Sequence, residues 1–164
     1  MERYLIHLKN EKHIPINSRE IVNRARDLIS KMNAHIRLAR IATTFIEFDV
    51  AIETKDVDIL VEKLSPIGDL DNLRHVVEED IEIDQGIKDG IFYFNAERFW
   101  ECHEAFEGVW KQCFGREKEL VQGIILVAVA YAHAQANELS IGVAMLTRAL
   151  EKLGSSPSMY HSID

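Results

Sequence analysis

A histidine with acidic neighbours lies inside an apolar stretch in the C-terminal half of this chain. Residues 99–110 read Phe-Trp-Glu-Cys-His-Glu-Ala-Phe-Glu-Gly-Val-Trp. At about 100° per residue, a helix over this stretch puts His103 on the same apolar face as Trp110. Glu107 follows one turn later on nearly the same side, whereas Glu101 is expected to point toward solvent. Because an unpaired buried polar group costs about 1–3 kcal/mol, the pattern predicts a buried polar site around His103.

A second pair of polar side chains interrupts the apolar segment that follows, which is expected to be a helix over about residues 117–136. Gln122 and His133 share one face of this helix. They are about three turns apart, roughly 16 Å along the axis, and therefore cannot contact each other. Each needs a partner from elsewhere, and the preceding helix is the obvious source through His103, Glu104 and Glu107.

Three uses of this polar cluster remain open. In the first, Glu107 orients His103 and the network only fixes how the helices pack. In the second, His103 and Glu107 bind a divalent metal ion or a small ligand, with His133 adding a nitrogen. The His-Glu-x-x-Glu spacing only half matches the His-Glu-x-x-His zinc motif, because a glutamate replaces the second histidine. In the third, Glu104 or Glu107 is a general base, but no nucleophile stands beside them and no catalytic residue is assigned.

The first eighty residues alternate short strands and helices. Expected strands cover residues 3–8, 36–41, 44–53 and, more weakly, 73–77. Helices are expected after Asn17 and after Thr54. In the third strand, apolar residues alternate with polar ones, as in a half-buried strand. The order strand, helix, strand, strand, helix, strand predicts a ferredoxin-like βαββαβ domain over residues 1–80.

From about residue 84 the apolar spacing is helical throughout. Four segments are expected, the last ending at Gly154, and they predict an all-α four-helix domain over residues 84–154. The chain as a whole is therefore predicted to be α+β. Residues 155–164 have no periodicity and are expected to form a loose tail.

Composition limits the possible environments and partners. The 164 residues carry a formal net charge of −8, and neither half has the basic excess that non-specific nucleic-acid binding requires. The composition therefore disfavours nucleic acid as a partner. The longest apolar run is half the length of a membrane span, which indicates no membrane partner. The two cysteines are expected to lie too far apart to form a disulfide, and the N-terminal residues lack the apolar stretch of a signal peptide. Both features predict a cytoplasmic protein. A few basic residues are mixed with acidic ones and are expected to be a solvated face: Arg24, Lys31, Arg37 and Arg40.

The C-terminal half resembles a family of all-helical bacterial and archaeal domains, the domain of unknown function 309 (DUF309). The resemblance rests on His103-Glu104-x-x-Glu107-x-x-Trp110, followed by Gln122-Gly123 and an apolar helix with His133, and it covers roughly residues 84–154. It implies an all-helical fold and no particular activity. The candidate ligand-binding residues that follow are His103, Glu104, Glu107, Trp110, Gln122 and His133.

Two hypotheses of function follow. The first is a cytoplasmic protein whose helical half binds a small molecule or a divalent metal at this site, with His103, Glu107 and His133 as the metal ligands. The alternative is a protein–protein interaction or dimerisation module, in which the polar network is structural and the chain forms a homo-oligomer.

Overall fold

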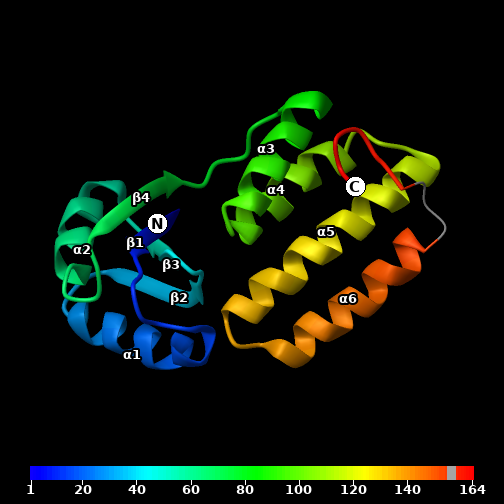
Figure 1. Cartoon of the computed structure of the whole chain (residues 1–164). Helices are drawn as coiled ribbons and strands as arrows, with labels where there is room; N and C mark the ends of the chain where they lie inside the picture. The colour runs from blue at the N-terminus through cyan, green and yellow to red at the C-terminus, as the bar shows by residue number, and fades with distance from the viewer. Residues whose placement is uncertain (155–157) are drawn as a thin grey trace. The chain divides into compact units, whose positions relative to one another are not determined.

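The computed structural model describes residues 1–154 and 158–164 of the chain. They form two compact units, one made of residues 1–78 with 135–137, the other of 79–134 with 138–164. The chain is a mixed α+β protein, with a four-stranded antiparallel sheet at the N-terminus followed by helices (Figure 1). Residues 155–157, where the expected tail begins, lie outside the described part of the chain.

The N-terminal unit contains four strands and two helices. The sheet has the order β2-β3-β1-β4, with every neighbouring pair antiparallel. Short 3-10 turns at Pro15–Asn17 and Thr54–Asp56 precede the two helices. The elements are β1 (Glu2–Lys9), α1 (Ser18–Leu28), β2 (Ala34–Ile41), β3 (Phe45–Ile52), α2 (Val57–Leu64) and β4 (Leu70–His75).

The last strand lies a few residues earlier than the sequence pattern predicts. We expected residues 73–77, whereas β4 covers Leu70–His75. Its residues pair with β1, where Leu73 lies opposite Ile6 and Leu70 opposite Leu8. Pairing with β1 sets the limits of β4, and no local sequence pattern reveals this partner.

One face of the sheet and the inner sides of α1 and α2 enclose the core of the N-terminal unit (Figure 1). The alternation in β3 puts its apolar residues into this core, as a half-buried strand should. However, β3 is buried at all eight positions, so the polar residues on its other face are also removed from solvent. The apolar side chains that β3 contributes to the core are Ile46, Phe48, Val50 and Ile52.

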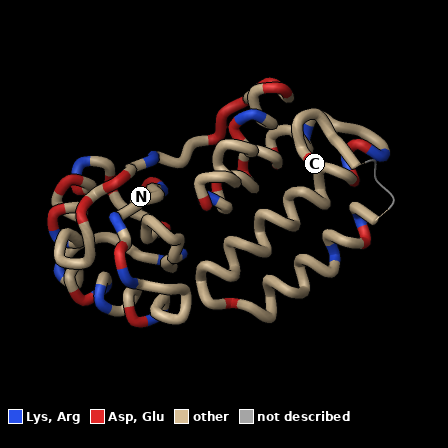
Figure 2. Tube along the Cα trace, viewed as in Figure 1, with Lys and Arg blue, Asp and Glu red and all other residues tan. Residues whose placement is uncertain are grey.

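The second unit is helical. It contains α3 (Ile83–Asn95), α4 (Phe99–Trp110), α5 (Gly115–Gln135) and α6 (Leu139–Leu153). After a charged first turn, α5 carries no Lys, Arg, Asp or Glu (Figure 2), and its apolar residues pack in the core of this unit. Even so, none of the helices among the described residues is long and apolar enough to cross a membrane.

Residues 158–164 pack on the helical core instead of lying loose. Tyr160 and Ile163 exchange two backbone hydrogen bonds, of 2.9 and 2.8 Å, and both side chains contact the core of the helical unit. The Tyr160 hydroxyl donates a hydrogen bond of 2.7 Å to Glu117 at the start of α5. The turn requires a left-handed backbone at His161, with φ +50°. Two apolar side chains and one hydrogen-bonded hydroxyl therefore order a segment that lacks helical or strand periodicity.

Two glycines in the helical unit provide a test of its packing. A Cβ on Gly90 of α3 would lie 2.4 Å from a ring carbon of Phe106, a side chain that is buried. We expect Gly90→Ala to lower the free energy of unfolding by about 1–3 kcal/mol, because the Phe106 ring must move. A Cβ on Gly108 of α4 would meet nothing within 4 Å. Gly108→Ala should therefore raise the free energy of unfolding by up to about 1 kcal/mol, since glycine disfavours a helix interior.

Urea unfolding of the two variants beside the unchanged protein measures both effects. Opposite signs for the two substitutions are the expected result. A gain in stability for both would contradict the close contact of α3 with α4.

Candidate functional site

His103 is buried in the first half of α4, with 9% of its surface exposed. Its Nδ1 lies 3.0 Å from the backbone carbonyl oxygen of Trp100. Because a carbonyl oxygen only accepts, Nδ1 carries a proton and donates it to this hydrogen bond. Nε2 lies 3.2 Å from the Glu107 carboxylate. A histidine held through one nitrogen by a backbone carbonyl has the orientation typical of metal-binding histidines.

Trp100 and the acidic side chains complete this part of α4. The Trp100 indole lies over the His103 ring, with the two centroids 4.5 Å apart. Its Nε1 donates a hydrogen bond of 2.9 Å to the Glu104 carboxylate. The Glu107 side chain is half exposed. The pair His103 and Glu107 is therefore accessible on the glutamate side, while the ring itself is packed.

His133 takes part in a different pair. Its Nδ1 lies 3.6 Å from a carboxylate oxygen of Glu138. The backbone N–H of Glu138 also donates to the His133 carbonyl, at 2.9 Å. The chain reverses at Asn137, which has φ +61°, and this reversal brings Glu138 back to the last turn of α5.

The structure thus brings together some of the candidate residues and not others. Among the residues described, no hydrogen bond or ion pair joins His133 or Gln122 to His103. Within the same residues, no third metal-ligating side chain forms a cluster with His103 and Glu107. Helical spacing shows which face of each helix carries these side chains, but it does not give the rotation of α5 against α4. That rotation decides which of them meet.

Trp110, at the end of α4, contacts the helical core. The Lys118 ammonium lies 4.0 Å from the centre of its ring, a favourable cation–π geometry. Its Nε1 is buried, and none of the described residues accepts a hydrogen bond from it. Trp110 therefore packs in the core through its ring, while its polar atom is unsatisfied in the described part of the chain.

The structure shows that the expected position of Glu101 is wrong. The helical periodicity placed it toward solvent, but it is completely buried. Both carboxylate oxygens accept hydrogen bonds from Arg98, at 2.7 and 2.8 Å. The Arg98 guanidinium, three residues earlier in the chain, neutralises the buried charge through this bidentate ion pair. Hydrophobic periodicity alone does not reveal such a pair.

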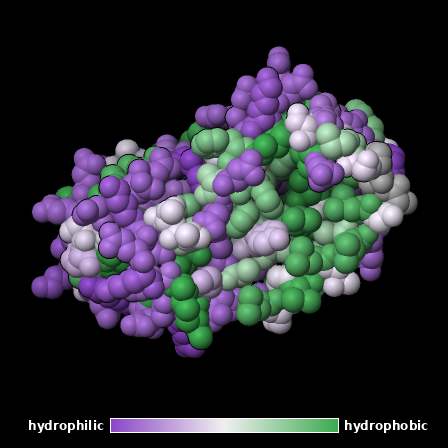
Figure 3. Space-filling view, viewed as in Figure 1, coloured by the Kyte–Doolittle hydropathy of each residue, from purple (hydrophilic) through white to green (hydrophobic). Residues whose placement is uncertain are grey.

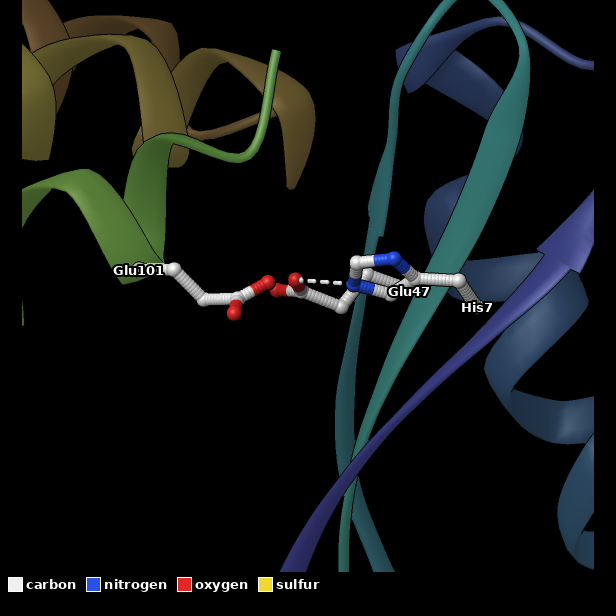
Figure 4. Close-up of side chains that lie close together, drawn as sticks. All are labelled: His7, Glu47 and Glu101. Carbon is white, nitrogen blue, oxygen red and sulfur yellow. Dashed lines mark hydrogen bonds and ion pairs between the residues drawn. The ribbon is translucent and has the colours of Figure 1, made fainter. Parts of the chain in front are cut away.

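A second polar cluster lies on the N-terminal sheet, on the face opposite the core. His7 of β1 and Glu47 of β3 face each other across the two strands, and His7 Nε2 lies 2.7 Å from the Glu47 carboxylate (Figure 4). Arg40 of β2 lies opposite Glu47 on the other side and donates from Nε at 2.5 Å. The His7 ring also stacks on Phe45, at 4.4 Å between centroids. Three adjacent strands thus converge on one carboxylate.

Asp49 continues the cluster two residues along β3. Arg3 donates two hydrogen bonds to its carboxylate, of 3.1 and 2.8 Å. Arg37 and Arg40 lie 3.5 and 3.9 Å away. Two members of the basic group expected on a solvated face are therefore engaged with acidic residues of the sheet, and Arg40 is buried.

The charge balance determines the protonation of Glu47. Burial alone would raise the pKa of this carboxyl, but the Arg40 charge and the hydrogen bond with His7 outweigh burial. The pKa of Glu47 falls from 4.5 to about 2. The group therefore stays ionised well below the pH at which a solvent-exposed glutamate takes up a proton.

Sequence reasoning missed this cluster because its members are far apart in the chain. His7 is a single histidine in a strand, and its partner lies forty residues later. A usable signal did exist: Glu47 and Asp49 alternate with apolar residues in a strand that a four-stranded sheet would place centrally. Carboxylates on a central strand require counter-charges from its two neighbours.

Comparison with known proteins supports the resemblance in the helical half. The model of a family described as a domain of unknown function (DUF309) matches residues 87–145, from α3 into α6. All six candidate residues lie within this segment, whereas the N-terminal sheet lies outside it. Comparison with curated proteins and with solved structures gave no significant match.

The Glu47 pKa gives a pH prediction. Because the folded pKa is lower than the unfolded value of 4.5, ionised Glu47 stabilises the fold above about pH 4.5. The stabilisation is lost progressively as the pH falls toward 2. Glu47→Gln should cost about 3–5 kcal/mol at pH 7, since His7 and Arg40 lose their buried counter-charge. It should also flatten the decline in stability between pH 4.5 and 2.

Chemical unfolding as a function of pH measures both parts. The matched control is Glu62→Gln, on the exposed side of α2, which should change stability by less than about 0.5 kcal/mol. An equal effect of the two substitutions would show that Glu47 is not the charge on which the sheet depends.

Proposed function

We propose that the helical half is a ligand-binding domain and that its ligand is a divalent cation held by His103 and Glu107. The observation that supports this most directly is the hydrogen bond from His103 Nδ1 to the Trp100 carbonyl. It leaves Nε2 facing a Glu107 carboxylate oxygen at 3.2 Å, so that the neutral form of the ring offers this nitrogen to a metal ion. Imidazole nitrogen and carboxylate oxygen are both ligands that Zn²⁺ accepts.

The surroundings of the pair favour a cation over an anion. Glu104 and Glu107 both lie within one helical turn of His103, and Glu104 is held in place by Trp100. Two protein ligands leave most of a tetrahedral coordination shell to water or to a small molecule. The proposal therefore includes a small ligand that binds through the ion, on the exposed side of Glu107.

The remaining candidate residues have indirect roles in this proposal. Glu104 orients Trp100, whose indole packs on the His103 ring. Trp110 packs against the core of the helical unit, and Gln122 is given no role. His133 is paired with Glu138, and we leave it out of the cation ligands.

We also propose finer assignments for the fold and the location. The strand and helix order, with the sheet order β2-β3-β1-β4, supports a ferredoxin-like domain over residues 1–80. Helices α3 to α6 support a four-helix domain over residues 84–154. Free, buried Cys102 and Cys113 are consistent with a cytoplasmic location.

Calorimetric titration with Zn²⁺ tests the site. We expect one binding event in the unchanged protein, and His103→Ala should weaken it more than about tenfold, because even second-shell residues contribute that much. Glu107→Gln should act in the same direction, since it removes the charged ligand. The matched control is His35→Ala, an exposed histidine that should leave binding unchanged. Equal losses in the two histidine variants would refute the assignment.

A specific feature of α6 supports a second candidate function, self-association. Leu139, Val143, Leu146 and Leu150 are 62%, 64%, 39% and 70% exposed. At about 100° per residue these four residues occupy a 60° sector of the helix. We call them the α6 stripe. Their spacing of four, three and four residues is that of a heptad seam.

The rest of α6 shows that the α6 stripe faces outward. Gly142 and Ala149 are buried and mark the inner side of the helix. At about 100° per residue, the charged residues Arg148, Glu151 and Lys152 lie more than about 100° from the centre of the stripe. Hydrophobic surface gathers over α5 and α6 in Figure 3. Exposed apolar surface without intervening charge favours a matching apolar surface as its partner, and the same stripe on a second copy provides one.

Light scattering over a range of protein concentrations tests self-association. The unchanged protein should dimerise as its concentration rises. Leu150→Glu should keep it monomeric, because two stripes would then each carry a buried charge. Thr147→Glu, an exposed residue outside the stripe, is the control and should leave the dimer intact. A protein that stays monomeric at every concentration would rule out this candidate.

A further inference from the structure

We propose that the helical unit contains a second binding site, separate from His103 and Glu107, that takes a small uncharged and mainly apolar molecule. The site is a pocket of about 550 Å³. Its walls come from α3, α4, α5 and the end of α6, and from residues 158–164. Apolar side chains that line it include Ile91, Phe106, Leu120, Ile124 and Val127.

The volume of the pocket is that of a binding site and is too large for a packing defect. Protein interiors are packed to nearly crystalline density, and their voids are few and seldom larger than a water molecule. Ligand pockets generally have about 300–1,000 Å³ and mainly apolar walls. A pocket of this size with these walls is therefore suited to an organic molecule of several rings or a branched aliphatic one.

The pocket and the proposed cation site use different sides of α4. Cys102 and Phe106 line the pocket, whereas His103 and Glu107 do not. A change in the pocket therefore need not affect the pair on the other side of the helix. The two proposals can fail independently of each other.

The chemistry of the pocket walls disfavours a charged ligand. Burial raises the pKa of the Cys102 thiol to about 12, so the group is neutral. Burial, together with the hydrogen bond to Glu117, raises the pKa of Tyr160, so its hydroxyl is neutral as well. Among the lining residues that the structure describes, Asp164 alone carries a charge, and it is exposed at the rim. A carboxylate there disfavours anions.

The rim supplies a few hydrogen-bonding groups for one polar end of the ligand. Asn95, Ser158 and Ser162 are exposed and line the pocket. An amide, two hydroxyls and one carboxylate accept hydrogen bonds readily. The ligand that fits is therefore apolar over most of its surface, with a neutral hydroxyl or amine at the rim.

The turn formed by residues 158–164 closes one side of the pocket. Tyr160 and Ile163 both line it and are joined by their two backbone hydrogen bonds. The Tyr160 hydroxyl fixes the turn to Glu117 of α5. Residues outside the regular helices thus complete the wall.

Fluorescence titration with phenylnaphthylamine, a neutral apolar probe, tests the proposal on the full chain. We expect saturable binding with one site per chain. Val127→Phe fills the pocket and should weaken binding more than tenfold. Val143→Phe is the matched control, because it makes the same change on the exposed α6 stripe. Equal weakening in both variants, or unsaturable fluorescence, would overturn the proposal.

A second pair of variants avoids changing the core. Ser162→Trp narrows the pocket from its exposed rim and should also weaken probe binding, whereas Ser140→Trp, exposed on α6, should not. The anionic probe anilinonaphthalene sulfonate should bind more weakly than the neutral probe, and a preference for the anion would contradict the assigned ligand class. His103→Ala should leave probe binding unchanged, which separates this test from that of the cation site.

Discussion

The N-terminal sheet depends on neutralising the two carboxylates that β3 carries into a buried position. Glu47 and Asp49 alternate with core residues on a strand that has no exposed position. Each is therefore stable only if the neighbouring strands supply positive charge or a hydrogen-bond donor in the correct register. His7 from β1 and Arg40 from β2 do so for Glu47, and Arg3 does so for Asp49. A shift of one residue in either pairing would remove these partners, so the charges specify the register of the sheet.

The helical unit is organised in a different way. Its polar contacts are mostly local. For example, His103 interacts with groups three and four residues away on the same helix. The contacts between helices are mainly apolar, and they include close approaches such as that of Gly90 to Phe106. The geometry of His103 and Glu107 is therefore determined within α4, whereas the shape of the apolar pocket depends on how several elements pack.

This difference explains how far the sequence could predict the structure. Local periodicity indicated every main helix and strand, and i, i+4 spacing correctly suggested that His103 and Glu107 are close. The same reasoning could not show whether Gln122 or His133 approaches His103, since that depends on the rotation of α5 about its axis. It also missed His7 with Glu47, a contact between distant segments, and it placed Glu101 in solvent because it did not consider Arg98. The turn at Tyr160 was missed because it has no repeating pattern.

The position of Cys102 has a practical consequence. The thiol is buried, neutral and part of the pocket wall, so little of the reactive thiolate forms until opening of the surrounding side chains relieves its burial. Its rate of modification therefore reports on breathing of the helical unit without any engineered label. Because Cys113 is also buried but is not among the residues lining the pocket, it provides an internal reference thiol in the same molecule.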